Sequence, residues 1–199
     1  MRVSLPSTDE YVCIIAVLAV QNASVNGAIH VIETNDVGSG YGMLNSTAVV
    51  GATSTTIQLA QGNPSSVDNH YNGDSVYIQS GTGLGQLRRI VNYDGASRTL
   101  TTNTGFSTTP DTTSTVLISP TVNIIGDGVG ALAYSLVNTN GNISNVNVIA
   151  VGSKYTHAKA YISSNTVQGT GATANVIISP IGGHGKDPIR ELGGNKVCL

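Results

Sequence analysis

One pattern occurs twice in this sequence with the same internal spacing, and this repeat limits what the chain can fold into. The motif NGxI followed by VGSxY occupies residues 26–41 and again residues 140–155, so all seven matched positions are offset by 114 residues. Further along, the strings GAT at 51–53 and GAT at 171–173 each lead into a short apolar stretch, and we interpret them as the continuation of the same repeat. The repeat predicts a duplicated structural module.

Each copy of the repeat has the features of a small β-meander. An Asn-Gly pair is a strong hairpin signal because both residues tolerate positive φ. Residues 144–151 (SNVNVIAV) alternate apolar and polar side chains, as a strand with one buried face does. The VGSxY string then turns the chain, and residues 157–162 (HAKAYI) alternate again as the returning strand.

A third unit lies between the copies. Residues 74–79 (DSVYIQ) and 87–93 (LRRIVNY) are predicted strands around the glycine-rich turn at 81–86, and residues 114–119 (STVLIS) form a further strand. Strands at this spacing, separated by turn residues, are typical of sandwiches and barrels. Abundant Thr, Val and Ile favour strands as well.

The sequence therefore predicts an all-β fold in which duplicated small β-meander modules form a sandwich- or barrel-like architecture with little helix. We expect an N-terminal β module at 1–53, a central β-hairpin module at 54–120, a second repeat copy at 121–180 and a Gly-rich docking segment at 181–199, which together can form one continuous domain.

Charge and cysteine content argue against several classes of partner. The net charge is −2 and the nine basic residues are scattered, whereas nucleic-acid surfaces need clustered Lys and Arg, so we expect no nucleic-acid partner. The apolar stretch 12–20 (VCIIAVLAV) is far short of the roughly 20 residues that span a bilayer, and we expect a buried strand or one short helix and no membrane partner. Two cysteines near opposite ends of the chain are interpreted as free thiols, which suits assembly in a reducing cytoplasm.

No catalytic or cofactor-binding pattern is present in the sequence. The strings GTGLG at 81–85 and GDGVG at 126–130 resemble nucleotide loops, but each joins two predicted strands and no helix follows to receive a phosphate. One aspartate within the second string is too few for a calcium loop. The four histidines and the sparse carboxylates are dispersed along the chain. We expect a protein that is not an enzyme and that holds no cofactor or metal.

The C-terminal segment differs in character from the rest. It gathers four of the twenty charged residues within six positions, in a glycine-dense stretch where Asp187-Pro188 is able to open one helical turn. A solvated loop with a short helix is one interpretation. The functional interpretation is a docking surface for a partner subunit, and its predicted interface residues are His184, Lys186, Asp187, Arg190, Glu191 and Leu192.

This segment also carries a resemblance to a known family. The string SPIGGHGKDPIRELGG at 179–194 resembles a signature of a baseplate wedge protein in T4-like phages, particularly marine and cyanobacterial myoviruses. The blocks GDGVGALA, VGSKYTHAKAYI, GTGATANVIISP and YIQSGTGLGQLRRIVNYDGASRTLTT resemble modules of phage virion proteins. Together these blocks cover roughly residues 26–194. Members of the wedge family continue past the ELGG string into a further β region, so we expect this chain to correspond to a fragment, a divergent short member or a truncated frame.

The resemblance implies a non-enzymatic structural component of the tail baseplate wedge of a contractile-tailed bacteriophage. It would act through protein–protein interfaces with other wedge and tail-fibre proteins, as a homo-oligomer located in the virion. The alternatives are a tail-fibre-associated adhesin or carbohydrate-binding module, a tail-associated depolymerase, and a capsid decoration or neck protein. The adhesin alternative predicts an exposed cluster of tyrosines with Asn and Asp nearby.

Overall fold

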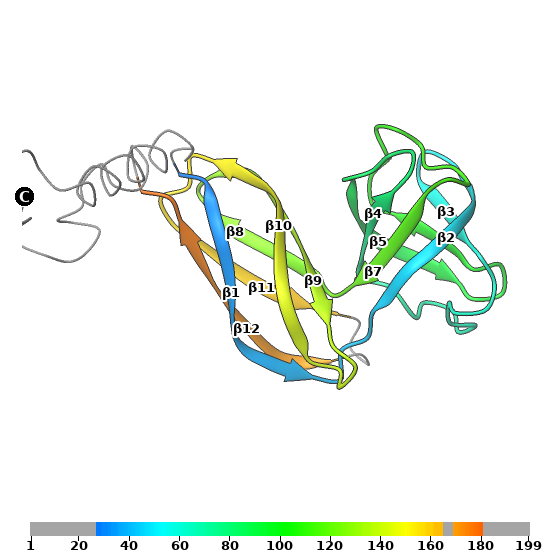
Figure 1. The fold of residues 1–199 in the computed structure, drawn as a ribbon, viewed down its shortest axis with the longest axis horizontal. Coiled ribbons are helices and arrows are strands. Elements are labelled where there is room, and N and C mark those ends of the chain that lie inside the picture. The colour runs from blue at the N-terminus through cyan, green and yellow to red at the C-terminus, as the bar shows by residue number, and fades with distance from the viewer. Residues whose placement is uncertain (1–26, 165–168, 181–199) are drawn as a thin grey trace, which may run out of the picture.

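A computed structural model of the chain describes residues 27–164 and 169–180. Within them every regular element is a β-strand, and the strands form two antiparallel six-stranded bodies placed side by side (Figure 1). The expectation of an all-β, barrel-like fold is confirmed. The strands are β1 Ile29–Ser39, β2 Leu44–Ala52, β3 Thr56–Leu59, β4 Ser75–Ser80, β5 Leu87–Asp94, β6 Thr99–Thr102, β7 Thr115–Ser119, β8 Thr121–Gly126, β9 Val129–Val137, β10 Ile143–Ser153, β11 Ala158–Ser163 and β12 Thr170–Ile178.

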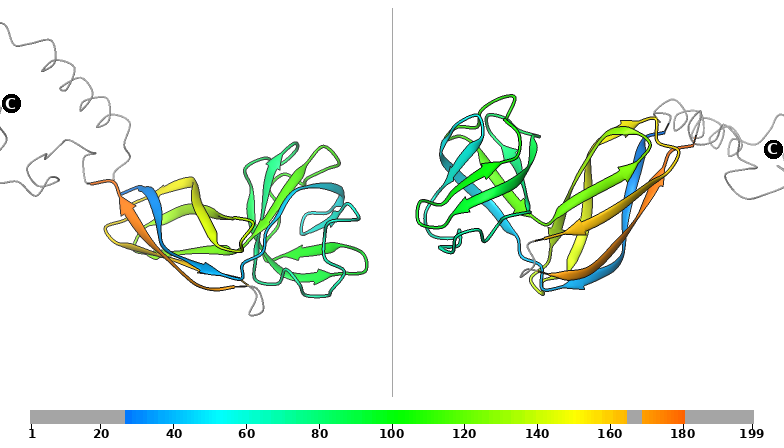
Figure 2. Two further views of the ribbon diagram at one scale, coloured as in Figure 1. Left: turned by 60° about the horizontal axis from the view of Figure 1, so that its bottom comes forward. Right: turned by 180° about the vertical axis from the view of Figure 1, so that it is seen from behind.

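The first body, named here the sheet body, has the strand order β1-β12-β11-β8-β9-β10. Its two edge strands, β1 and β10, pack against each other, so the sheet curls into a nearly closed barrel (Figure 2). Strand β1 comes from the start of the described chain, and its partner β12 comes from the end. The sheet body is therefore assembled from segments on both sides of a long insertion.

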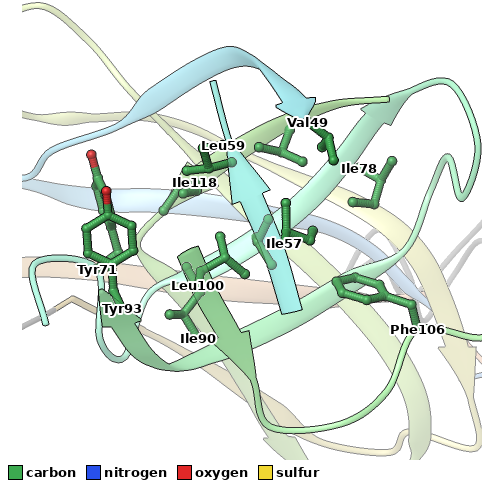
Figure 3. Close-up of a cluster of buried hydrophobic side chains, with 12 residues drawn as sticks. Val49, Ile57, Leu59, Tyr71, Ile78, Ile90, Tyr93, Leu100, Phe106 and Ile118 are labelled. Atoms are coloured by element: carbon green, nitrogen blue, oxygen red, sulfur yellow. The ribbon is translucent and has the colours of Figure 1, made fainter. Parts of the chain in front are cut away.

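The insertion is the second body, named here the barrel body. Strands β2 to β7 close into a barrel of order β2-β3-β6-β5-β4-β7, and this barrel connects to the sheet body at β1 and β8 (Figures 1 and 2). Its interior is filled by side chains from all six strands and their loops (Figure 3). Each fully buried Ile or Leu contributes roughly 1.5–3 kcal/mol by leaving water. The cluster contains Val49, Ile57, Leu59, Tyr71, Val76, Ile78, Ile90, Tyr93, Leu100, Phe106, Val116 and Ile118.

The glycine strings at 81–85 and 126–130 are turns, as their positions between predicted strands indicated. The first joins β4 to β5, and the second joins β8 to β9. A third turn follows β5, where Asp94 accepts hydrogen bonds from the backbone N–H groups of Ala96 and Ser97 at 2.8 and 3.2 Å. The Asp94 carboxylate thus binds the backbone N–H groups of the turn in place of water, which is a common role for aspartate.

The sequence repeat corresponds to a pseudo-two-fold symmetry of the sheet body. Adding 114 to the residue numbers of β1 gives those of β10, and subtracting 41 from those of β12 gives those of β9. The pair Ile29–Ile178 thus corresponds to the pair Ile143–Val137. Every register pair between β1 and β12 maps in this way onto a pair between β10 and β9, and both irregularities of register recur at the same positions. Duplication of the module, expected from the sequence, is visible down to single register shifts.

A glycine and a tyrosine approach each other closely in each half of the sheet body. Gly38 and Gly152 have φ of +58° and +64°, and each lies beneath a tyrosine ring, that of Tyr41 or of Tyr155. A Cβ at Gly38 would lie 2.5 Å from the Thr170 carbonyl oxygen and 2.7 Å from the Tyr41 ring. Only glycine fits such a position, because both the backbone angle and the space exclude a side chain.

The tyrosines also connect the two halves through their backbone. Tyr41 N–H donates to the Gly141 carbonyl, and Tyr155 N–H donates to the Gly27 carbonyl, each at 2.9 Å. The motif NGxI…VGSxY is thus completed across the pseudo-symmetry axis, since the tyrosine of one copy binds the Asn-Gly turn of the other. Among the shared residues, the tyrosine and the glycine of the Asn-Gly pair therefore bind each other across the axis.

Two details differ from the sequence interpretation. The string at 51–53 lies at the end of β2 in the barrel body, whereas the string at 171–173 lies in β12, so these two stretches are not equivalent. Gly171 instead corresponds to Gly130 at the start of β9. The returning strand β11 also does not pair with β10; it pairs with β8 and β12 in the centre of the sheet. Alternation of side chains identifies a strand but does not identify its neighbour.

The glycine–tyrosine contacts give a direct stability test. We predict that Gly38→Ala and Gly152→Ala each lower the free energy of unfolding by roughly 3 kcal/mol or more, because the new methyl group meets backbone atoms of the neighbouring strand. Gly85→Ala is the matched control: Gly85 has φ +88°, but a Cβ added there would meet nothing within 4 Å, so it should cost only about 1 kcal/mol. Urea denaturation measures all three, and equal costs at positions 38 and 85 would contradict the role of the close contact.

Candidate interaction surface

The six interface residues predicted from the sequence, between His184 and Leu192, lie outside the described residues, and so does the apolar stretch 12–20. The described chain begins and ends at the same end of the sheet body, where Ser179 N–H donates to the Ala28 carbonyl at 2.8 Å. We name this the terminal end (Figure 1). The opposite end, which carries the barrel body, is named the junction end.

At the junction end, the barrel body is fixed to the sheet body by stacking and by hydrogen bonds. The rings of Tyr77 on β4 and Tyr134 on β9 stack with centroids 4.6 Å apart and planes 14° apart. Burial, and then the neighbouring Tyr134, raise the pKa of Tyr77. Only Pro120 separates β7 from β8. So short a connection, together with a stacked aromatic pair, gives the two bodies a defined relative position.

Hydrogen bonds from small polar side chains complete this junction. The hydroxyl groups of Ser75 and Thr121 are 2.7 Å apart, and Thr121 Oγ1 donates to the Gly73 carbonyl at 2.8 Å. Ser164 Oγ donates to Asp74 Oδ1 at 2.8 Å, which connects the end of β11 to a buried carboxylate of the barrel body. Polar groups that are buried and satisfied in this way hold one geometry, since leaving them unpaired is costly.

Exposed apolar side chains are concentrated on the outside of the sheet body. Twelve large hydrophobic side chains are exposed among the described residues, and eight of them lie on strands of the sheet body. Scattered exposed hydrophobics are ordinary, but a concentration on one body marks a surface suited to contact with another molecule. The eight are Val31, Val37, Ile125, Val129, Leu132, Val151, Tyr161 and Ile177.

The four central strands align their outward residues into one row, named here the central row. Tyr161 on β11 is paired with Thr173 on β12 and with Asn123 on β8. Continuing the register that pairs Thr121 with Tyr134 places Leu132 of β9 beside Asn123. Tyr161 and Leu132 are 51% and 42% exposed, so the row presents an aromatic ring and an aliphatic side chain on either side of Asn123. This geometry suits flat contact with a partner surface.

The remaining described tyrosines are not available as a binding cluster. Tyr41, Tyr71, Tyr93 and Tyr155 are buried. Tyr93 packs edge-on against Tyr71 with centroids 4.7 Å apart and donates its hydroxyl to the Ser65 carbonyl at 2.7 Å. Burial, followed by the neighbouring Tyr71, raises the pKa of Tyr93 to about 12, as expected for a structural core phenol. Among the described tyrosines, Tyr161 alone is largely exposed.

A polar cluster at the terminal end was not visible in the sequence. Asp127, in the turn between β8 and β9, accepts hydrogen bonds from Thr156 Oγ1 at 2.5 Å, from Thr156 N–H at 2.9 Å and from His157 N–H at 3.2 Å. The His157 Nδ1 atom is 3.5 Å from Asp127 Oδ2. Asp127 and His157 are 30 positions apart in sequence, and only the fold brings them together.

The hydrogen bonds to Asp127 change its acidity. The Thr156 hydroxyl, then the Thr156 and His157 backbone amides, hold the pKa of the Asp127 carboxyl far below its ordinary value. A carboxylate bound by backbone amides acts as a cap for the connection between β10 and β11.

Over the described residues, no group of three His, Cys, Asp or Glu side chains is placed to hold a metal ion. Residues 27–164 and 169–180 contain no helix long and apolar enough to cross a bilayer.

No family model, curated protein or solved structure matches this chain. What the described residues define is therefore a class of structure: an all-β chain of two barrel-like bodies with a fixed junction and exposed apolar side chains on one of them.

The acidity of Asp127 leads to a pH-dependent prediction. Because its folded-state pKa is depressed, its contribution to stability is present above its ordinary pKa of 3.8 and is lost as the pH falls below that value. We predict that Asp127→Asn lowers the urea midpoint at neutral pH, and that the difference from wild type shrinks between about pH 5 and about pH 2. Glu33→Gln, which removes a carboxylate from an exposed position of β1, is the control. A difference independent of pH would contradict the carboxylate's role.

Proposed function

We propose that this chain is a structural, non-enzymatic virion protein, a component of the tail baseplate wedge of a contractile-tailed bacteriophage, and that it acts through protein–protein interfaces. The observation that carries the proposal is the central row, where Tyr161 and Leu132 are exposed at positions that hold Asn123 and Thr173 in the other half of the sheet body. The resemblance of residues 179–194 to the wedge signature supports the location. The proposed partners are other wedge and tail-fibre proteins, together with further copies of this chain.

Comparison between the two halves of the sheet body supports an interface at the central row. The pseudo-symmetry pairs Tyr161 with Asn123 and Leu132 with Thr173, so the same structural position tolerates a polar residue in one half and carries an apolar one in the other. The fold therefore does not require Tyr161 or Leu132 to be apolar. Their exposure costs solubility without adding to the core, which favours a role in binding.

Rigidity is the second requirement of an assembly component. A protein that positions neighbouring subunits needs its parts in a fixed relation, because association already costs translational and rotational freedom. The stack of Tyr77 on Tyr134 and the hydrogen bonds of Thr121 and Ser164 provide this between the two bodies. Low charge supports the same proposal, since only 10% of residues are charged and lasting interfaces contain few charges at their centre.

The adhesin alternative is supported by one observation. Tyr161 is exposed, and Asn123 lies opposite it on the neighbouring strand, so one aromatic ring and one amide are available to a sugar. The exposed cluster of tyrosines that this alternative predicts is not found among the described residues, where four tyrosines are buried and two stack on each other at the junction. Assembly is therefore the better-supported function.

Substitutions taken from the repeat itself test the central row. We predict that the double variant Tyr161→Asn and Leu132→Thr keeps the wild-type urea midpoint within experimental error but weakens self-association at least tenfold, about 1.4 kcal/mol. Sedimentation velocity over a range of concentrations measures the association. Val91→Thr, at an exposed position of the barrel body, is the matched control and should have no effect. Unchanged association of the double variant would remove the central row as the interface, and binding to host polysaccharide that the variant abolishes would favour the adhesin.

The baseplate location has its own test. We predict that the reading frame of this chain lies among tail and baseplate genes, and that antibodies against the chain label the baseplate of intact virions in electron micrographs. Labelling of the distal fibres or of the capsid, or a locus among fibre or lysis genes, would contradict the wedge assignment. This result does not depend on which strands form the interface.

A further inference from the structure

The outward residues at the terminal end of the sheet body form an apolar collar. Val31 and Ile177 are paired across β1 and β12 and are 39% and 38% exposed. Ile125 and Val129 lie on either side of the β8–β9 turn and are 62% and 63% exposed, and Val151 is close to the end of β10. Each of these residues lies within two or three positions of the terminal end of its strand. We name the five residues the collar.

The repeat shows that the collar is not a requirement of the fold. Under the pseudo-symmetry, Val31 corresponds to Asn145 and Val129 corresponds to Thr170, which occupy the same positions at the junction end. Continuing the pairs of β11 with β12 and of β8 with β9 makes Ile125 equivalent to Ser163. Three of the five collar positions are therefore polar in the other half. The module folds with polar residues at these positions, so the fold does not require apolar ones. An apolar set at the terminal end alone indicates that another segment or molecule covers the collar.

A segment of this chain is suited to cover it. Extending the 114-residue offset toward the N-terminus aligns residues 15–20 (IAVLAV) with residues 129–134 (VGALAY) of β9, with Leu18 and Ala19 matching Leu132 and Ala133. In the sheet body, β9 pairs with β10, so a segment equivalent to β9 would pair with β1. That edge of β1 is occupied by β12 in the same register, and the other edge packs against β10. The position beside β1 that this alignment predicts is therefore already filled by β12.

We propose that residues 12–20 of this chain cover the collar. Gly27, where the described chain begins, lies at the terminal end because its carbonyl accepts the Tyr155 N–H. The six residues between Val20 and Gly27 allow a separation of roughly 23 Å when extended, so the length of the chain lets the segment fold back over the terminal end. The nine residues from Val12 to Val20 contain no charged or hydrogen-bonding polar side chain other than a thiol, so they gain by leaving water at an apolar surface.

Hydrogen exchange on the full-length chain, at a concentration where sedimentation shows a monomer, tests the proposal. Peptides covering residues 12–20 should exchange about tenfold or more slowly than an unstructured peptide of the same sequence. The triple variant Val31→Asn, Ile125→Ser and Val129→Thr carries the residues of the other half of the repeat. It should abolish that protection and leave peptides from β4 and β5 unchanged, and Val91→Thr should leave both unchanged. The single variant Ile125→Ser serves if the triple variant does not fold.

Three outcomes would overturn the proposal: exchange of residues 12–20 at the unstructured rate in the wild-type chain, protection that the collar variants leave intact, or protection that appears only when the chain associates. The last outcome would assign the collar to contact between copies. Hydrogen exchange is measured on the monomer, so absence of protection at residues 12–20 would leave the proposed assembly function untouched. Likewise, a negative result in the self-association experiment would not affect the exchange result.

Discussion

The sheet body depends on the contact between a tyrosine ring and a glycine backbone, made once in each half. At Gly38 and Gly152 the chain comes so close to the neighbouring strand that a side chain has no room, and the rings of Tyr41 and Tyr155 cover these positions. Gly169 and Gly128 leave space on the other side of the same rings. Since each tyrosine N–H also binds the Asn-Gly turn of the other half, the two contacts fix the edge strands β1 and β10 relative to each other and keep the sheet nearly closed.

This arrangement makes the body a duplication whose strands are permuted in sequence. One half consists of the consecutive strands β8, β9 and β10, whereas the other consists of β11 and β12 from the end of the described chain and β1 from its start. The barrel body occupies the connection between β1 and β8. Its closure is local, with neighbours drawn from within residues 44–119, while closure of the sheet body must wait for contacts between distant segments. We expect the barrel body to fold before the sheet body, because its contacts are closer in sequence.

Much of the strand content could be predicted from the sequence. The alternating stretches at 144–151, 157–162 and 87–93 correspond to β10, β11 and β5, and the glycine strings are turns. Which strands pair with each other could not be predicted in the same way. Alternation shows which face of a strand is buried but not which strand lies beside it. The repeat also gives each strand two equivalent candidate neighbours. The Asp127–His157 contact was missed because 30 residues separate the two side chains, and nothing in their local sequence marks the contact. The central row around Tyr161 required the register of four strands.

The first and last described residues, 27 and 180, lie at the same end of the sheet body, and this has a mechanical consequence. Strands β1 and β12 are antiparallel neighbours and meet the rest of the chain at the same end. A force that separates residues 27 and 180 therefore breaks the hydrogen bonds between β1 and β12 one after another, and each step meets little resistance. A force between that end and the inserted barrel runs along the strands and loads all of their hydrogen bonds together. We therefore expect the described part of the chain to resist tension along the strands and to yield when residues 27 and 180 are pulled apart.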